Sequence, residues 1–328
     1  MYIPVLKKVI YSDNILLERA LPLKGTISAH SGQKVEPFHK LGIAKVSYSY
    51  LELGSKIKFV KGKDVGSFIY AGKKIGSVGL RAIMAPFDGY IAKRHDSYVL
   101  RQENRDYWLL SGVWGEVVDV IKDTSILIKT QAVDIHLTVS INKNIEGELV
   151  VFPNPSDLLE MQYLENFTKN VEGKIIYVGD FATYKFMKRA YELGVAGVLA
   201  GGADKNTFVF AKENGMFLGV FTGFGYEHIP SFIYDILKDV SSRYVFLYGD
   251  KGILRIPMPA QSSGQNPSTK NTSPFRQVEK GLKVQVLQKP YFGWIGEVDS
   301  ISGSSIFVRF DGKKDIQEVK IPNILAIE

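Results

Sequence analysis

Two glycine clusters in the middle of the chain have residue types suited to an anion pocket. Each cluster follows a predicted strand, and ligands of α/β sheets sit at the carboxyl ends of strands, where helix N-termini attract anions. Neither the dinucleotide-binding fingerprint nor the phosphate-binding P-loop pattern is present, so turn geometry is the alternative role. The candidates are Gly201, Gly202, Gly223 and Gly225, with Asp180, Thr183 and His228 as polar neighbours.

A lysine cluster in the first third of the chain is the second candidate site. Residues 1–110 hold 18 Lys or Arg against 9 Asp or Glu, whereas the whole chain has a net charge of +7. Such a cluster attracts polyanions through its electric field and through counterion release. The alternative is a lysine-coated surface that keeps sheet edges soluble and unpaired. The densest part consists of Lys56, Lys58, Lys61, Lys63, Lys73 and Lys74.

The remaining residue types give little support for catalysis. The chain has no cysteine, which excludes disulfides, thiolate zinc sites and cysteine nucleophiles. None of the five histidines has the i, i+4 spacing of a helical metal site, and no serine has the context of a nucleophile elbow. We therefore predict no catalytic residue, no metal site and no cofactor, and we favour a non-catalytic protein over an enzyme.

Targeting signals are also missing from the sequence pattern. No apolar run approaches the roughly 20 residues that a membrane helix needs. The first eight residues do not combine a charged segment with an apolar one, as a secretory signal would. We expect a cytoplasmic protein with no integral membrane segment.

The chain divides into regions of different pattern, and its 328 residues suit about two domains of ~150 residues or several smaller ones. Residues 1–150 contain many short strands between glycine turns, as in an all-β barrel or sandwich. Residues 151–258 form a small α/β domain, residues 259–274 a flexible linker of small polar residues, and residues 275–328 a short β unit. The predicted fold class is multidomain and mainly β with a small α/β domain, and the linker predicts few contacts between the last unit and the rest.

The α/β region shows a strand–helix–strand pattern. Apolar runs over 174–178 and 195–200 predict buried strands, and one apolar face over 186–194 predicts the helix between them. This order implies parallel strands joined by a right-handed crossover. A further buried strand is expected over 217–221, and Asp134, in an alternating strand before this region, is expected to face solvent.

The last unit contains a short strand over 284–287, an aromatic loop, and a glycine at 296 that lets the chain bend before the next strand. This segment resembles a KOW motif in an SH3-like barrel. The resemblance implies binding to ribosomal RNA, ribosomal proteins or RNA polymerase, although this copy is almost neutral. The aromatic residues of the loop are candidates for base stacking or protein contact, and the alternative is that they pack in the core. They are Tyr291, Phe292 and Trp294.

Two stretches of the first unit, Pro22-Leu23-Lys24-Gly25 and Pro86-Phe87-Asp88-Gly89, each precede a predicted strand. They resemble the barrel-sandwich hybrid of biotinyl and lipoyl domains and of membrane-fusion proteins. Carriers of that family hold biotin or lipoate on a lysine in a hairpin, but Gly79-Leu80-Arg81-Ala82 precedes the second strand here. We therefore expect a lipoyl-like barrel with a structural or docking role and without an attached cofactor.

These features leave three hypotheses. The first is a non-catalytic protein that associates with RNA, the ribosome or the transcription machinery through the KOW-type barrel and the lysine-rich N-terminal region. The second is a protein–protein adaptor or scaffold subunit, including self-association. The third is an enzyme with its site at the strand ends of the α/β domain. Salt-sensitive nucleic-acid binding favours the first and salt-insensitive self-association the second.

Overall fold

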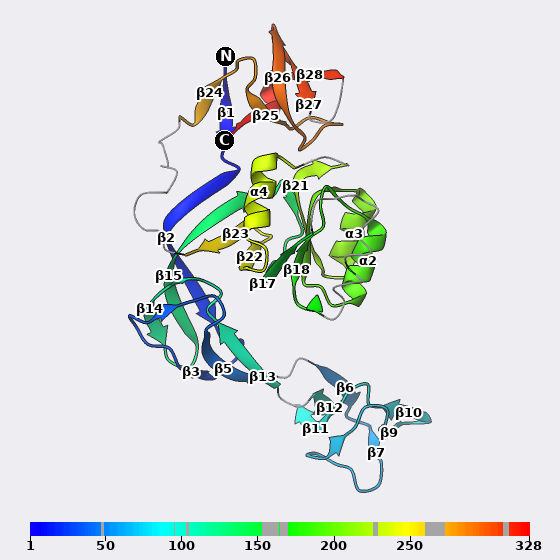
Figure 1. Cartoon of the computed structure of the whole chain (residues 1–328). Coiled ribbons are helices and arrows are strands. Elements are labelled where there is room, and N and C mark those ends of the chain that lie inside the picture. The colour runs from blue at the N-terminus through cyan, green and yellow to red at the C-terminus, as the bar shows by residue number, and fades with distance from the viewer. Residues whose placement is uncertain are drawn as a thin grey trace.

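The protein is mainly β, with several sheets and three α-helices in the part of the chain that the structure describes. This confirms the coarse fold class expected from the sequence. In Figure 1 the two ends of the chain lie together at one end of an elongated molecule, and strands β6 to β12, within residues 50–102, lie at the other. The computed structural model describes residues 1–46, 49–94, 96–102, 105–152, 164, 170–225, 229–259, 273–310 and 315–328.

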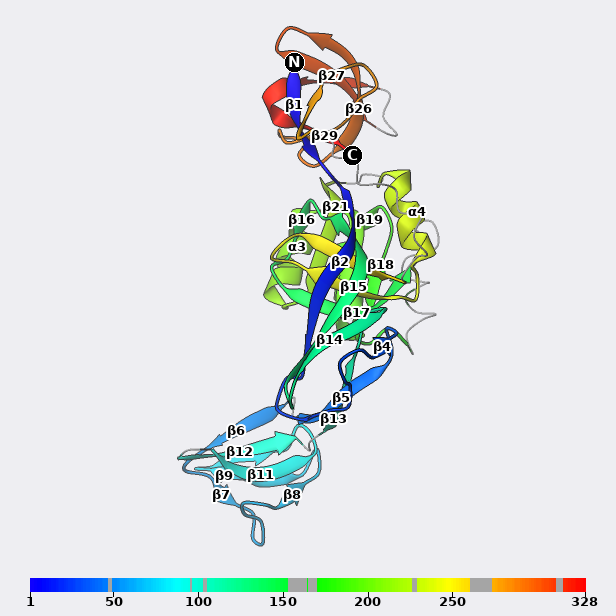
Figure 2. The same cartoon turned by 90° about the vertical axis from the view of Figure 1, so that its left-hand side faces the viewer.

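A large central sheet joins segments that lie far apart in the chain, from β2 at residue 9 to β23 at residue 258. Its order is β16-β21-β20-β18-β17-β22-β23-β15-β14-β4, with β19 beside β20 and β2 beside β15. Figure 2 shows β2 running as a long strand from the two chain ends towards the opposite end of the molecule. The strands are β2 (Val9–Ala20), β4 (Lys34–Val35), β14 (Gly115–Ile121), β15 (Ser125–His136), β16 (Val139–Ser140), β17 (Asn144–Val151), β18 (Ile175–Tyr177), β19 (Phe181–Ala182), β20 (Gly197–Ala203), β21 (Phe217–Phe224), β22 (Tyr244–Tyr248) and β23 (Ile253–Met258).

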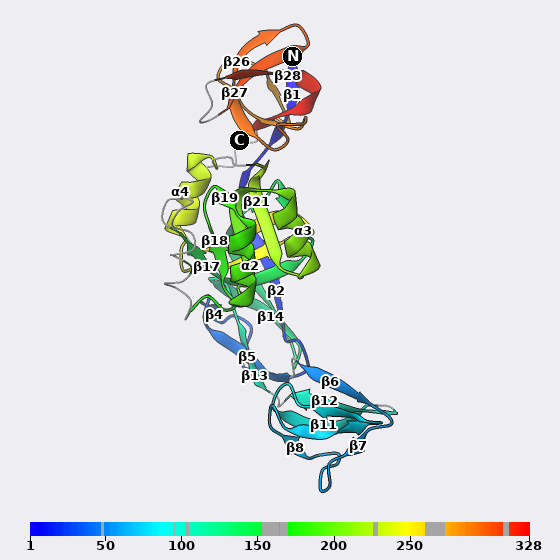
Figure 3. The same ribbon diagram turned by 90° about the vertical axis from the view of Figure 1, so that its right-hand side faces the viewer.

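Strands β17, β18, β20 and β21 are parallel, and helices cover both faces of this part of the sheet. Helices α2 (Tyr184–Glu192) and α3 (Lys205–Glu213) pack on one face, and α4 (Ser231–Asp239) packs on the other, as Figure 3 shows. Strands buried on both faces read as continuous apolar runs, which is why the sequence pattern revealed them. The sequence pattern missed α3.

The C-terminal unit is a seven-stranded sheet of order β24-β1-β29-β25-β26-β27-β28. Strand β1 pairs with β24 and β29, so the first residues of the chain belong to the same sheet as the last ones. The sequence had placed these first residues in the N-terminal unit. The strands are β1 (Tyr2–Leu6), β24 (Phe275–Gln277), β25 (Lys283–Val286), β26 (Ile295–Ser302), β27 (Ser305–Phe310), β28 (Ile316–Lys320) and β29 (Ile324–Ile327), with a 3-10 turn at Ile321–Asn323.

The distal lobe, residues 50–102, is a small β unit with a core of its own. It is inserted between two strands, β5 and β13, that pair with each other. The lobe has a four-stranded sheet of order β6-β12-β11-β8 and a three-stranded sheet of order β10-β9-β7. The strands of the lobe are β6 (Tyr50–Gly54), β7 (Lys58–Phe59), β8 (Phe68–Ile69), β9 (Lys74–Val78), β10 (Arg81–Met84), β11 (Gly89–Arg94) and β12 (Ser97–Gln102). Outside the lobe, β5 (Lys40–Val46) and β13 (Arg105–Leu110) form a separate three-stranded sheet with β3 (Thr26–Ile27), of order β13-β5-β3.

The structure also bears on three further expectations from the sequence: the exposure of Asp134, a membrane-spanning helix and the linker. Asp134 is buried rather than facing solvent, because Arg255 lies directly opposite on β23 and forms a bidentate ion pair with it at 2.7 and 2.8 Å. Across the described ranges, no helix has both the length and the apolar character needed to cross a bilayer. The expected linker, 259–274, lies almost wholly outside the described residues.

Candidate nucleic-acid interface

All six lysines singled out by the sequence lie in the distal lobe, on β7, β9 and the turns beside them, and all are exposed. None of them forms an ion pair with a carboxylate of the described residues. The lobe contains ten Lys or Arg against four Asp or Glu, a net charge of +6, where the whole chain has +7. The positive charge of the protein is therefore concentrated in this lobe and is not neutralised locally.

Turn geometry presents part of this charge on a tight loop. Lys61 and Lys63 flank Gly62, whose φ of +81° lies in the left-handed region that favours glycine. The backbone N–H of Lys63 donates to the carbonyl of Val60 at 3.0 Å, which closes the turn. The side-chain amine of Lys63 reaches the carbonyl oxygen of Phe68 at 3.4 Å, so its charge lies next to strand β8.

Sequence reasoning missed a set of exposed tyrosines in the same lobe. Tyr50, Tyr70 and Tyr90 are 58%, 64% and 42% exposed, although they occur next to or near buried core residues. The available signal is the alternation along the strands: Tyr70 follows buried Ile69 and Tyr90 precedes buried Ile91. Large rings that stay in solvent on a basic surface are typical of nucleic-acid interfaces.

The four glycines of the candidate anion pocket do lie at strand ends, at the carboxyl ends of β20 and β21. Backbone fills the space beside two of them. A Cβ built on Gly223 would overlap the carbonyl oxygen of Phe292, and one on Gly202 would overlap that of Gly225. Among the other candidates, Thr183 is the N-cap of α2, Asp180 is buried, and His228 lies outside the described residues.

The aromatic residues of the KOW-like segment are half-buried where the C-terminal unit meets the central sheet. Tyr291 and Trp294 pack on Phe310, with ring centroids 5.3 and 5.2 Å away. The indole N–H of Trp294 donates to the carbonyl of Phe224 at 3.2 Å, and the backbone of Phe292 lies against β21. These contacts contradict the expectation that the last unit touches the rest of the chain only weakly.

A buried polar network lies in the same contact. Lys8 is 1% exposed, and its amine donates to Thr138 Oγ1 at 2.9 Å and to the carbonyl oxygens of Phe221 at 3.0 Å and His136 at 3.3 Å. Gln285 of the C-terminal unit donates to the same Thr138 oxygen at 2.8 Å. Burial among neutral acceptors lowers the pKa of Lys8 to about 7. Burial and then the Lys8 charge also lower the pKa of His136.

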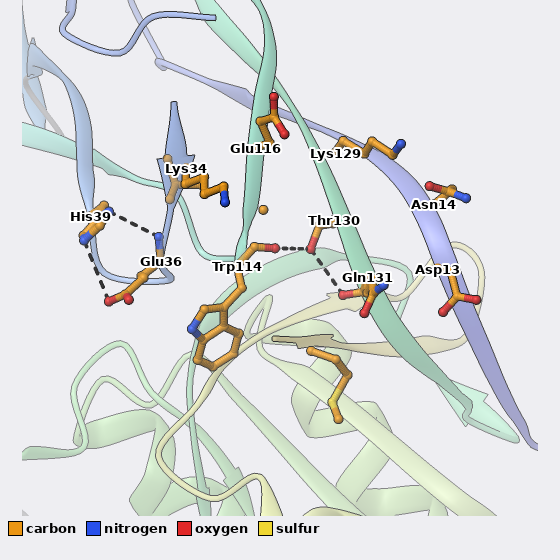
Figure 4. Close-up of a pocket in the computed structure, with 13 residues that line it drawn as sticks. Asp13, Asn14, Lys34, Glu36, His39, Trp114, Glu116, Lys129, Thr130 and Gln131 are labelled. Atoms are coloured by element: carbon orange, nitrogen blue, oxygen red, sulfur yellow. Dashed lines mark hydrogen bonds and ion pairs between the residues drawn. The ribbon is translucent and has the colours of Figure 1, made fainter. Parts of the chain in front are cut away.

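A pocket of about 570 Å³ opens where β15 changes neighbour, from β14 at Thr130 to β23 at Gln131. Figure 4 shows the two Thr130 hydroxyl contacts, to the carbonyl oxygens of Trp114 and Gln131, at this fork. The ionisable side chains that line the pocket include both acidic and basic types and are exposed, so they do not define one class of ligand. They are Asp13, Lys34, Glu36, His39, Glu116 and Lys129.

The described residues contain no cluster of three or more histidine, aspartate or glutamate side chains placed to hold a metal ion. Of the five histidines, His30 and His39 are exposed, His136 is half-buried on β15, and His95 and His228 fall outside the described residues. No protein-family model matches this chain, and a search of curated proteins finds no similar sequence.

Proposed function

We propose that this protein is a non-catalytic nucleic-acid-binding protein that engages RNA through its distal lobe. The observation that carries the proposal is the net charge of +6 on the 53 residues of that lobe, with six exposed lysines that have no carboxylate partner among the described residues. Lysines that neutralise phosphates release condensed counterions, which gives sequence-independent affinity. Ribosomal or transcription complexes, which contain accessible RNA, are the expected setting.

The proposed architecture includes the two resemblances found in the sequence. The sequence placed the barrel-sandwich hybrid in residues 1–150, on two stretches. Pro86-Phe87-Asp88-Gly89 lies in the distal lobe, whose two small sheets support such a hybrid there, whereas Pro22-Leu23-Lys24-Gly25 lies outside the lobe, before β3. The seven-stranded C-terminal unit supports an SH3-like barrel of KOW type. In this proposal the KOW-like aromatic loop has an intramolecular role, because it contacts β21. The C-terminal unit then stabilises the body of the protein, and the lobe at the other end makes the contact with RNA.

The test is a titration of a labelled 20-nucleotide RNA by fluorescence anisotropy between 50 and 300 mM KCl. Affinity should fall steeply with salt, with a slope of roughly −0.7 for each phosphate neutralised on a single strand. Changing Lys56, Lys58, Lys61 and Lys63 together to Glu should weaken binding at least 100-fold at 100 mM KCl and flatten the slope. Binding by this variant equal to that of the wild type would refute the proposal.

A matched control distinguishes the effect of charge in the distal lobe on RNA binding from the effect of the net charge of the whole protein. Four exposed lysines of α2 and α3 can be changed to Glu, which alters the net charge of the protein by the same amount. We expect less than a threefold effect from this set. An equal loss of affinity in both sets would show that only the overall charge matters. The control residues are Lys185, Lys188, Lys205 and Lys212.

One observation favours the adaptor hypothesis as a second candidate. The turn between β9 and β10 carries Leu80, which is fully exposed, and Val78 at the end of β9 beside it is 40% exposed. Apolar side chains gathered at one tip are typical of protein contacts. Self-association measured by analytical ultracentrifugation, insensitive to salt and removed by Leu80→Asp, would favour an adaptor over an RNA-binding protein.

A further inference from the structure

We propose that the outer face of the four-stranded sheet in the distal lobe is a stacking platform for the bases of single-stranded nucleic acid. The platform consists of Tyr50, Arg101, Tyr90 and Phe68, with Tyr70 at its end. This inference rests on the proposed function and deepens it: the lysines supply affinity for phosphates, and this face selects strands whose bases are unpaired.

The strand register places these residues in one row. Tyr50 on β6 is directly opposite Arg101 on β12, Arg101 is opposite Tyr90 on β11, and Tyr90 is opposite Phe68 on β8. Residues directly opposite each other in antiparallel strands project from the same face. The row therefore crosses all four strands of the sheet, although its members are far apart in the sequence.

The neighbouring row identifies which face this is. Leu51, Leu100 and Ile91 are also paired across the strands, one position along, and they belong to the core of the lobe. Because side chains alternate between the two faces of a strand, the row of Tyr50, Arg101 and Tyr90 points away from that core. Its exposure agrees: Arg101 and both tyrosines are exposed, and Phe68 is half-buried.

The rings hold one another in place without being covered. Phe68 makes edge contacts with Tyr90, at a centroid distance of 4.9 Å, and with Tyr70, at 5.1 Å. Tyrosine has only two side-chain torsions, so a ring fixed by a neighbour loses little further entropy when a base stacks on it. Base–aromatic stacking tolerates any base, because every base has a π face.

Positive charge lies within the row and at its Phe68 end. Arg101 lies within it, and a guanidinium plane stacks on bases as well as binding phosphate. The Lys63 amine lies beside Phe68 at that end, 3.4 Å from its carbonyl oxygen. Glu52 is the acidic residue of the next row on this face, opposite Val99. The surplus of positive charge in the lobe favours a polyanion as the occupant over a protein surface.

Single strands and duplexes respond differently to such a face. A duplex keeps its base faces stacked inside the helix, so it can reach only the lysines, whereas a single strand offers bases to the rings and phosphates to the cations. Loss of a ring should therefore weaken single-strand binding selectively. Loss of lysines should weaken binding of both forms.

The experiment uses the full chain and three labelled probes at 100 mM KCl: a 12-nucleotide oligouridine, the matching oligothymidine, and a 12-base-pair RNA duplex. Tyr70→Ala and Tyr90→Ala are each expected to weaken binding of both single strands by about 5- to 150-fold, the range for losing one stacked base. Duplex binding should change less than twofold. Tyr90→Phe, which keeps the ring, should bind like the wild type.

The control is Tyr184→Ala on α2, an equally exposed tyrosine (48%) that also makes an edge contact with a phenylalanine. Its binding should be unchanged, and thermal melting should show that every variant is folded. Tyrosine variants that bind single strands like the wild type, while the lysine variant fails, would overturn the stacking platform and leave the proposed function standing. Equal losses for single strands and duplex would overturn it too. A wild-type protein that binds none of the probes would refute both.

Discussion

The distal lobe and the C-terminal unit are both small β units with a group of aromatic residues, but they use these residues in opposite ways. In the C-terminal unit Tyr291 and Trp294 pack on their own core, and Trp294 also donates a hydrogen bond to β21. In the distal lobe Tyr70 and Tyr90 stay in solvent. An aromatic motif in the sequence therefore indicates that a contact surface forms. The tertiary structure then shows whether that surface is covered by the same chain or is left for another molecule.

The polar groups of the two units also differ in whether a partner within the protein already satisfies them. The C-terminal contact satisfies its buried donors with neutral acceptors, as the network of Lys8, Thr138 and Gln285 shows. The lysines of the distal lobe are exposed and have no carboxylate partners among the described residues. An unneutralised surface is available for a ligand, whereas a fully satisfied one stabilises the fold.

Breaking the C-terminal contact at Gly293 should have the largest effect. Its φ is +89°, and an added Cβ would overlap the carbonyl oxygen of Thr222 and lie 2.9 Å from the Cα of Gly223. Backbone strain and overpacking together should lower the free energy of unfolding by about 2–6 kcal/mol for Gly293→Ala, measured in urea. Gly303→Ala is the control, because Gly303 also has a positive φ (+58°) but faces open space. Similar losses from both variants would contradict an intimate contact.

The pH dependence of stability should report on Lys8. Because its pKa is about 7 when folded and near 10.5 when unfolded, the unfolded chain binds more protons between these values. The free energy of unfolding should therefore rise with pH, by about 3 kcal/mol from pH 7 to 9.5, and stay flat below pH 7 as far as Lys8 is concerned. Above pH 10 burial of Tyr177 and Tyr244, which raises the pKa of each, opposes this trend.

Chemical denaturation at pH 7, 8.5 and 9.5 measures this slope for the wild type and for Lys8→Met. We expect the slope to disappear in the variant. A wild-type curve without a rise, or an equal rise in both proteins, would show that Lys8 is not held neutral in the contact.

Variants of the aromatic residues in the two units should separate the effect on stability from the effect on RNA affinity. Trp294→Ala removes a half-buried ring and should lower the free energy of unfolding by about 2 kcal/mol, with RNA affinity within twofold of the wild type. Tyr90→Ala should do the reverse, with a stability change below about 1 kcal/mol and the loss of affinity described above. Paired denaturation and anisotropy measurements on both proteins check this. If both variants lose RNA affinity, the C-terminal unit is part of the interface.

The smallest expected effect concerns one hydrogen bond. Trp294→Phe keeps an aromatic ring but removes the indole donor to the carbonyl of Phe224. A typical hydrogen bond contributes about 1 kcal/mol to stability, and urea denaturation can resolve a loss of that size. An unchanged midpoint would mean that ring packing alone holds this part of the contact.

The sequence predicted those features that depend on local pattern. The strand–helix–strand unit around α2 was found because buried parallel strands are continuous apolar runs. The lysine cluster was found because its members lie close together in the sequence. Helix α3 was missed, since Lys205–Glu213 has only a weak apolar face. The glycines at 201 and 223 were correctly placed at strand ends, but the backbone of Phe292 that covers Gly223 comes from a distant segment.

Features that depend on long-range pairing were not predictable in this way. The row of Tyr50, Arg101 and Tyr90 exists only because two strand pairs, β6 with β12 and β12 with β11, align in register. Likewise, nothing in Tyr2–Leu6 specifies a partner at the far end of the chain, because an alternating apolar strand fits many edges. The alternation in the tyrosine-bearing strands was visible, but the neighbours across the sheet were not.

The pairing of β1 with β24 has a consequence for biosynthesis. Tyr2 leaves the ribosome before its partner Gln277 has been made, and at about 5–20 residues per second the wait is on the order of ten seconds to a minute. During that time the first strand has an unpaired edge, while the segments between can fold. Completion of the C-terminal sheet is therefore a late event relative to folding of the segments between, and a large domain fused before β1 would burden this step rather than the folding of the distal lobe.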